Sequence, residues 1–514
     1  MTEHNHRRTR AGSDKIAADD PRYGDLASRG SKRFAGTPDY VRLVSSTDEV
    51  VAAVQDAVRE QRRLAVRSGG HCLEGFVADP AVRVVIDMSL MTDIYYDPAM
   101  GAFAIEAGAR LGDAYRKLFL GWGVTIPAGV SPNVGIGGHV VGGGFGFLCR
   151  QHGLAADHLY GVEVVVVDAT GTATCVVATR EPSDLNRDLW WAHTGGGGGN
   201  FGIVTRYWFR SPPAAGSDPA ALLPTAPASV LTFNAAWNWR DVDEPTFTRL
   251  IGNFGAWCER NSAPDVPAAA LYSTLALGHR QHGTLDLSGL VTAGGEADRL
   301  LDAHLAAIND GVGIPYTCAT ARKSWLAFAL DPAPGLAAVN LEHAIFKLKD
   351  ALLRRRFTDR QIAVAYHYLT RTDHTVGLTL GMATYGGRIN TVAPDATASA
   401  HRDAILTTSV AAGWSDPQDE AQSMAWVRQF YREIFADTGG VPVPGAVSSG
   451  ANINHADSDL ADPAWNTSGV PWYTIYYQQN YLRLQQIKAR WDPRNVFHHA
   501  LSIRASEDSA GQSQ

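Results

Sequence analysis

The spacing of apolar and polar residues predicts a helix followed by a short strand between residues 46 and 70. A serine and an acidic first turn precede apolar positions at helical intervals, and a brief apolar run then ends in two glycines. Short apolar runs and one further amphipathic stretch continue this alternation through residues 82–129. The first part of the chain is therefore expected to form a compact α+β domain.

The pattern changes twice further along the chain. Residues 161–177 consist of an almost entirely apolar run, a turn and a returning run, which predicts a β-hairpin. Residues 211–230 are rich in Pro, Ala and Ser and indicate a domain boundary. Beyond it, residues 231–455 alternate strands with amphipathic helices, which suggests an antiparallel sheet carrying helices. Residues 470–503 end in a basic amphipathic helix that stops at "DPRN".

Composition narrows the class of protein. The 514 residues are 45% hydrophobic and 19% charged, with a formal net charge of −7. No dense Lys/Arg block occurs, so a nucleic-acid partner is not expected, and no stretch approaches the ~20 apolar residues of a membrane span. Five cysteines without CxxC spacing are typical of a reducing compartment, and a cytoplasmic location fits best: Cys72, Cys149, Cys175, Cys258 and Cys318.

Two glycine-rich segments and one glycine turn are the main chemical signals. A formal GxGxxG at Gly197, Gly199 and Gly202 is followed by a β-forming run, so it is not a dinucleotide-binding turn. No phosphate loop, HExxH metal motif or GxSxG nucleophile elbow occurs, and no metal site is expected. Glycines are kept where the backbone adopts positive φ or approaches a ligand closely, which a large flat or phosphorylated ligand would explain. His71, on the glycine turn, is then either a core histidine or a cofactor contact.

Several long motifs, in order along the chain, carry a family resemblance. They are "VRSGGHC", "PAGVSPNVGIGGHVVGGGFG", "GLAADHLYGVEVVVVDATG", "DLWWAHTGGGGGNFGIVT", "YGGRIN" and the closing "YYQQNYLRLQQIKARWDPRNVFHHALSI". With them the chain resembles flavin-linked oxidases of the berberine bridge enzyme type, in the vanillyl-alcohol oxidase superfamily. The likeness is greatest to bacterial members that oxidise hydroxyl groups on antibiotics and their sugars.

The resemblance implies an α+β fold with a PCMH-type FAD-binding domain of two α/β subdomains. A substrate domain with an antiparallel sheet covered by helices would lie over the flavin. The expected units are a frayed tail (1–30), the FAD domain (31–212), the substrate domain (213–454), a C-terminal segment that returns to the FAD domain (455–505) and a final tail (506–514).

The resemblance also assigns roles to residues. His71 would bond covalently to the 8α-methyl carbon of FAD, and His139 would support the N1 and C2 edge of the flavin. Val134 matches a position where valine leaves room for O2, which favours an oxidase. The implied cofactor-binding residues are Arg67, Ser68, Gly69, Gly70, His71, Cys72, Gly129, Ser131, Val134, Gly135, Gly137, Gly138, His139, Gly142, Gly199, Asn200, Gly202, Ile203, Val204 and Asn480, many of them through the backbone.

Two departures from the family pattern change the expected attachment and chemistry. Many relatives attach the flavin a second time through a cysteine where this chain has Ser131, so a single link through His71 is expected. Cys72 should leave the turn in another direction. Sugar-oxidising relatives carry tyrosine at the positions of Phe145 and His455, and the second of these tyrosines accepts the proton. A histidine, with an ordinary pKa of about 6.5, can act as a base near neutrality.

His455 is therefore the expected base, with Tyr385 of "YGGRIN" as a second acid, base or orienting group. The alternative is that His455 is only a pocket residue. The expected enzyme is an FAD-dependent oxidase of secondary metabolism. It would oxidise CH–OH or CH–NH in a small natural product and use O2 as acceptor, as a monomer or homodimer. An oxidative cyclase or dehydrogenase and a flavin-containing drug-binding resistance protein remain open alternatives.

Overall fold

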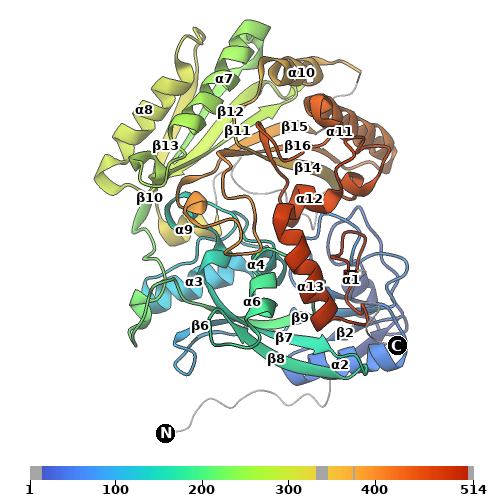
Figure 1. The fold of residues 1–514 in the computed structure, drawn as a ribbon. Helices are drawn as coiled ribbons and strands as arrows, with labels where there is room; N and C mark the ends of the chain where they lie inside the picture. The colour runs from blue at the N-terminus through green and yellow to red at the C-terminus, as the bar shows by residue number, and fades with distance from the viewer. Residues whose placement is uncertain (1–13, 332–344, 374–376, 507–514) are drawn as a thin grey trace.

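A four-stranded sheet forms the first layer of the molecule, near the N-terminal end of the chain (Figure 1). The computed structural model describes residues 14–331, 345–373 and 377–506. The strands are β1 (Asp14–Ala17), β2 (Tyr40–Leu43), β4 (Val84–Asp87) and β3 (Leu64–Arg67), in that order. β2, β4 and β3 are parallel, and β1 is antiparallel to β2. The predicted helix is α2 (Thr47–Arg59), capped by Ser46, whose side chain accepts from the backbone N–H of Glu49.

A second, five-stranded sheet lies beside the first and is antiparallel throughout. Its order is β5 (Ile94–Asp97), β6 (Ala102–Glu106), β9 (Ile203–Phe209), β7 (Leu159–Val167) and β8 (Ala173–Thr179). The predicted hairpin is confirmed, because β7 pairs with β8 around the turn at Asp168. The short helices of this half are α1 (Tyr23–Ala27), α3 (Leu111–Trp122), α4 (Ile136–Val141), α5 (Cys149–His152) and α6 (Arg187–Ala192).

The middle of the chain builds an eight-stranded antiparallel sheet, as predicted. Its order is β13 (Thr317–Ser324), β10 (Ser229–Asn238), β12 (Thr284–Val291), β11 (Leu271–Gly278), β15 (Leu378–Thr384), β16 (Leu406–Trp414), β14 (Ile345–Leu353) and β17 (Ser448–Gly450). The amphipathic helices α7 (Glu244–Arg260), α8 (Ala297–Asn309), α10 (Asp359–Thr370) and α11 (Glu420–Ile434) cover its outer face, and α9 (Trp325–Leu330) lies on the side of the first half (Figure 1). The opposite face is thus turned toward the first two sheets.

The C-terminal segment crosses from the large sheet back to the first half through α12 (Trp472–Tyr477) and α13 (Tyr481–Trp491) (Figure 1). Lys488 on α13 is buried and donates to the backbone oxygen of Asn200 at 2.7 Å, and Ile503 N–H donates to the Asn200 side chain at 2.9 Å. The Nζ of Lys488 also lies 2.6 Å from the carboxylate of Asp492, which balances the charge of the lysine. The last helix is therefore locked onto the glycine-rich loop that precedes β9.

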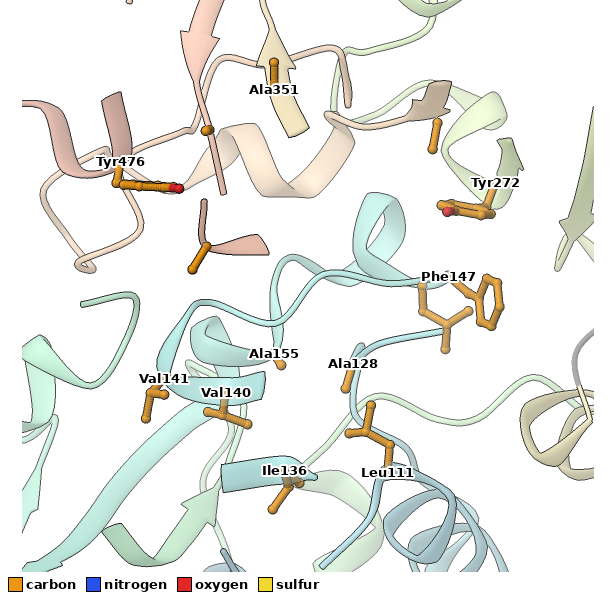
Figure 2. Packing of buried hydrophobic residues seen from close by; sticks show 14 of the residues in the cluster. Leu111, Ala128, Ile136, Val140, Val141, Phe147, Ala155, Tyr272, Ala351 and Tyr476 are labelled. Carbon is orange, nitrogen blue, oxygen red and sulfur yellow. The ribbon is translucent and has the colours of Figure 1, made fainter. Parts of the chain in front are cut away.

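Buried hydrophobic side chains connect the two halves. Phe147, which follows the glycine-rich segment, packs against Tyr272 of β11, with ring centroids 5.4 Å apart (Figure 2). It also packs against Phe328 of α9, with ring centroids 4.8 Å apart. Apolar contacts of this kind contribute in proportion to the area they remove from water. Among the described residues, no helix is both long and apolar enough to cross a membrane.

The predicted frayed tail is wrong from Asp14 onward. Residues 14–17 form the edge strand β1, with Ile16 fully buried, and α1 follows. Arg29 reaches Asp87 at 2.8 Å, and its carbonyl accepts from Arg67 at 2.9 Å. Polar contacts and strand pairing hold this segment in place. The spacing of apolar residues in the sequence predicts neither of them. Residues 1–13 and 507–514 lie outside the described residues, and the other domain limits stay predictions.

Candidate active site

Two of the segments predicted to bind the cofactor, the turn at Gly69 and the segment at Gly135, pack backbone against backbone. A Cβ atom on Gly69 would lie 2.2 Å from the nitrogen of Gly135, and a Cβ on Gly135 would lie as close to Gly69. Gly70 has φ +78°, a conformation that favours glycine. The N–H of Gly137 donates to the carbonyl of Ala107 at 3.1 Å. These glycines bring the turn that carries His71 directly onto the start of α4.

The third glycine-rich loop joins the same region. The N–H of Gly197 donates to the carbonyl of Val141 at 2.9 Å. The buried Asn200 amide donates to Gly196 at 3.0 Å and Gly197 at 3.2 Å, so its side chain shapes the loop from within. Gly202 packs on β7 and leads into β9, where Ile203 and Val204 are buried. Gly199 has φ +72°, a backbone conformation that favours glycine.

Asn454, which the sequence reasoning missed, fastens the C-terminal segment to α4. Its side-chain nitrogen donates to the carbonyls of Gly138 at 3.2 Å and His139 at 3.1 Å, and its oxygen accepts from Gly144 at 3.3 Å. A Cβ on Gly142 would lie 2.3 Å from the same amide, so a larger residue there would displace the Asn454 side chain. The only sequence signal was its position beside His455.

His139 presents a buried ring to this region. A Cβ on Gly129 would lie 2.7 Å from its Cε1, and one on Gly144 would lie 3.0 Å from its Nε2. Burial, together with smaller effects of the nearby His455 and His71, lowers the pKa of His139 to about 4. Three predicted site histidines therefore lie near one another. Among the described residues, the buried Nε2 of His139 has no hydrogen-bond partner.

These features fit a flat cofactor with hydrogen-bond acceptors. A Cβ on Gly138 would meet nothing within 4 Å, and Gly138 is exposed although its neighbours pack tightly. A neutral imidazole carries one N–H, which an acceptor edge of a flavin would satisfy. The described residues contain no group of three or more His, Cys, Asp or Glu that could hold a metal ion.

Other predicted cofactor residues use their side chains within the protein. Arg67 is buried against Asp87 at 2.8 Å, and its carbonyl accepts from the N–H of Met88 at 2.9 Å. Ser68 donates to the carbonyl of Ala107 at 2.6 Å, and its own carbonyl accepts from Arg29 at 3.0 Å. The amide nitrogen of Asn480 donates to the carbonyls of Pro394 and Thr397, at 2.7 and 3.1 Å, so this nitrogen holds a protein loop.

Cys72 and Ser131 are the predicted cofactor-binding residues with potentially nucleophilic side chains, and their surroundings differ. Burial raises the pKa of the Cys72 thiol to about 11, which disfavours the thiolate. Ser131 is buried, and its carbonyl accepts from the N–H of Val134 at 3.3 Å.

His455 is held by an acidic partner from the large sheet. It ends the short 3₁₀ turn Ile453–His455, and its Nδ1 lies 3.1 Å from Oδ2 of Asp350 on β14. The side chain of Asp350 is 2% exposed and that of His455 is 43% exposed. Burial raises the pKa of Asp350 above its ordinary value, and the hydrogen bond from His455 offsets only part of this effect. Asp350 was not foreseen, since it lies 105 positions from His455.

Tyr385 lies at the end of β15 and lines a cavity of about 20 Å³ together with Ile453 and Tyr476. Its ring contacts Phe145, with centroids 4.8 Å apart. Burial raises the pKa of Tyr385 above its ordinary value, so the phenol keeps its proton over the physiological range. It is thus suited to donating a hydrogen bond and poorly suited to accepting a proton.

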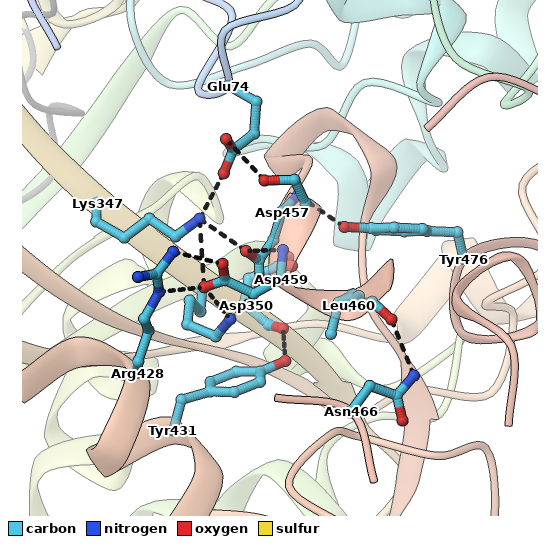
Figure 3. Close-up of polar contacts among 12 residues, drawn as sticks. Glu74, Lys347, Asp350, Arg428, Tyr431, Asp457, Asp459, Leu460, Asn466 and Tyr476 are labelled. Carbon is cyan, nitrogen blue, oxygen red and sulfur yellow. Dashed lines mark hydrogen bonds and ion pairs between the residues drawn. The ribbon is translucent and has the colours of Figure 1, made fainter. Parts of the chain in front are cut away.

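A largely buried cluster of six charged side chains links Glu74, three residues after His71, to the large sheet (Figure 3). We name it the six-charge cluster: Glu74, Lys347, Lys349, Arg428, Asp457 and Asp459. Lys347 contacts Glu74 and lies 2.7 Å from Asp457, whereas Lys349 lies 3.0 Å from Asp459. The cluster connects the segment after His71 to β14 and to the segment after His455.

Comparison with known proteins agrees with this geometry. A sequence profile described as "FAD binding domain" matches residues 38–175, and one described as "Berberine and berberine like" matches residues 451–504. Aclacinomycin-N/aclacinomycin-A oxidase of Streptomyces galilaeus is 52% identical over 492 residues, which are 95% of this chain and 89% of that protein. The chain belongs to the berberine-bridge-type family of FAD-linked oxidases. It is thus an FAD-dependent oxidoreductase.

Solved structures of the family superpose on nearly the whole chain. A glycopeptide hexose oxidase, solved in complex with teicoplanin, has a TM-score of 0.91 and 50% identity, covering 96% of this chain and 99% of its own. CrmK, a flavoenzyme of shunt-product recycling in caerulomycin biosynthesis, has a TM-score of 0.93 and 47% identity, covering 97% and 100%. The expected fold class and the enzyme class are thereby confirmed.

Proposed function

We propose that this flavoenzyme oxidises a CH–OH group to a carbonyl, or a CH–NH group to an imine, on a small natural product of antibiotic biosynthesis. Family members related over nearly the whole chain are named for aclacinomycins and for a glycopeptide hexose, which supports a glycosylated antibiotic as the substrate class. All five cysteines are unpaired, in keeping with the reducing cytoplasm as its location.

The single observation that carries the proposal is the position of His455. Its imidazole is bonded to buried Asp350 and is still partly exposed, and the adjacent residue Asn454 is fastened to the backbone of Gly138 and His139. A base must lie within hydrogen-bond reach of the substrate while the substrate lies against the cofactor. The position of this turn beside α4 and the large sheet supports assigning the substrate hydroxyl proton to His455 and an orienting hydrogen bond to Tyr385.

The residues that would hold FAD are the glycine-rich loops and two histidines. FAD bound there supplies the two-electron hydride acceptor, and O2 regenerates it with release of hydrogen peroxide. We assign to His71 a single covalent link to the cofactor. Ser131 stands where many relatives have a cysteine, and the raised pKa of Cys72 makes it a poor second attachment. Val134 stays the predicted position that admits O2, and His139 donates a hydrogen bond to the cofactor.

The covalent link is tested without a substrate. Acid-precipitated protein should stay yellow, and tryptic digestion should give one flavin-bearing peptide that contains His71. The His71→Ala variant should release its flavin into the supernatant, whereas Cys72→Ala and Ser131→Ala should retain it. A second flavin-bearing peptide would contradict the single link.

The reaction is tested with aclacinomycin N, aclacinomycin A, teicoplanin and glucose. Oxidation should consume O2 and release an equal amount of peroxide, and the product should be lighter by two hydrogen atoms. Trapping with hydroxylamine distinguishes a new carbonyl from ring closure, which gives the same mass. Anaerobic flavin that stays oxidised with all four compounds would contradict oxidation of this substrate class.

The base assignment is tested by His455→Gln. Removing a general base lowers turnover by about 10²-fold or more, and we expect this loss with little change in flavin content. His367→Gln, an exposed histidine on the outer helix α10, serves as the matched control. Turnover of His455→Gln within about threefold of the wild type would be incompatible with a general base at this position.

A further inference from the structure

We infer that Asp350 is the positioning residue of His455. Its carboxylate holds the imidazole through Nδ1, leaves Nε2 as the proton acceptor, and stabilises the imidazolium once the proton has moved. The inference rests on the role proposed for His455, and it adds a residue and an electrostatic device to that role. Neither the sequence nor the family comparisons assigned a function to Asp350.

Three elements fix the position of the Asp350 carboxylate. The residue sits within β14, which is paired with β16 on one side and β17 on the other. Its backbone carbonyl accepts from the Tyr431 hydroxyl of α11 at 2.7 Å, a contact drawn in Figure 3. Its Oδ1 accepts from the backbone N–H of Asn452 at 3.3 Å. The carboxylate therefore reaches His455 from a rigid, buried support.

The hydrogen-bond chemistry then decides the tautomer. When Asp350 is ionised its carboxylate only accepts, so the 3.1 Å contact then places a hydrogen on Nδ1 of His455. A neutral imidazole has one N–H, which leaves a lone pair on Nε2. Nε2 then takes the proton of the substrate hydroxyl as the C–H hydrogen leaves as hydride, and the C–O bond becomes a carbonyl. The new positive charge lies beside the Asp350 carboxylate.

His455 is the group that compensates the negative charge of Asp350. Within the described ranges, His455 is the only side chain that forms an ion pair with Asp350. The neighbouring Lys349 is held by Asp457 and Asp459.

Other titratable groups near the pair do not replace His455. Asp457 adds repulsion, because its charge raises the pKa of Asp350. Tyr385, Tyr431 and Tyr476 also lie near Asp350, but burial raises the pKa of each phenol, so they stay neutral. His139, which lies near His455, is neutral because burial lowers its pKa to about 4.

The inference is tested by NMR on protein labelled with ¹⁵N and ¹³C in its histidine rings, with FAD bound and no substrate. His455→Gln identifies the His455 signals by their disappearance. In the wild type above neutral pH, Nδ1 of His455 should carry the hydrogen and Nε2 should not. This measurement does not depend on an Asp350 variant that folds. A hydrogen on Nε2 and none on Nδ1 would overturn the inference.

The charge effect is tested by Asp350→Asn. An opposite charge at this distance shifts a titration by one unit or more, so the His455 midpoint should fall by about one pH unit in Asp350→Asn. Tyr431→Phe is the matched control, since it removes a hydrogen bond to the Asp350 backbone and leaves the carboxylate in place. Its midpoint should equal that of the wild type. Equal midpoints in Asp350→Asn and the wild type would overturn the inference.

The outcomes separate this inference from the proposed function. Full turnover by His455→Gln would overturn the base assignment, whatever the titration shows. A large loss in His455→Gln together with an unchanged titration in Asp350→Asn would leave the base assignment standing and overturn only the role of Asp350. In the His455→Gln background, Asp350→Asn should add less than about threefold to the loss, because a positioning residue acts through its partner.

Discussion

Strand β14 carries two buried polar regions that behave differently. In the six-charge cluster, three cations face three carboxylates, and every member has an oppositely charged neighbour. Beside it, the Asp350 carboxylate has a partly exposed histidine as its ion-pair partner. The two regions share a strand, and Asp350 directly follows Lys349 in sequence.

The pKa directions show what the difference does. Burial alone would raise the pKa of Asp457, but Lys347 and Lys349 outweigh it and hold that pKa below the ordinary value. Burial would lower the pKa of Lys347, but Asp457, Glu74 and Asp459 raise it. In Asp350 the effect of burial prevails. Ion pairing therefore stabilises the charged forms in the cluster, whereas burial favours the neutral form of Asp350 and His455 offsets only part of that effect.

The largest expected effect is on stability, from Lys347→Met. This substitution removes the cation that compensates the buried carboxylates of Glu74 and Asp457. Leaving a buried charge without its partner destabilises a protein by about 3–5 kcal/mol. Thermal unfolding should shift to clearly lower temperature. Lys15→Met removes the same side chain from an exposed ion pair with Glu60 and should change stability by less than about 1 kcal/mol. Equal shifts in the two variants would show that the cluster is not a structural element.

A second measurement compares Asp457→Asn with Asp350→Asn in urea unfolding at pH 5 and pH 8. Because the pKa of Asp457 is lowered on folding, its carboxylate stabilises the fold above about pH 4, and Asp457→Asn should lose roughly 2–3 kcal/mol at both pH values.

The pKa of Asp350 is raised on folding, so its ionisation lowers stability as pH rises from about 4 through the raised value. Asp350→Asn should therefore differ from the wild type by less than about 1 kcal/mol. A loss in Asp350→Asn as large as that in Asp457→Asn would contradict the comparison.

The smallest effect is expected from Tyr385→Phe. The phenol keeps its proton because burial raises its pKa, so its loss removes one hydrogen bond to the substrate and should slow turnover by about tenfold or less. The acid side of the pH–rate profile should stay where it is in the wild type. A shifted profile in this variant would transfer the base role from His455 to Tyr385.

The sequence predicted what local patterns encode. Helix α2, the β7–β8 hairpin and the strand after the glycine run follow from apolar spacing and capping. The predicted site histidines, His71, His139 and His455, are brought together, as their mutual effect on the pKa of His139 shows. Their assignment came from the family resemblance and not from spacing.

What the sequence did not predict depends on contacts between distant segments. Asp350 and Asn454 act through partners 105 and more than 300 positions away, respectively. Edge strand β1 has one large apolar residue, Ile16, and is fixed by pairing with β2. Asn480 was a predicted cofactor contact, yet its amide nitrogen bonds a loop 82 or more positions upstream. Local periodicity carries no information about such partners.

The crossing of the C-terminal segment has a consequence for how such enzymes diversify. His455 is fastened to α4 through Asn454, but Asp350 belongs to the large sheet. A recombination event that exchanged the middle of the gene would keep the proposed base and replace its acidic partner in the same step. Such an exchange would change the large sheet and the setting of His455 together.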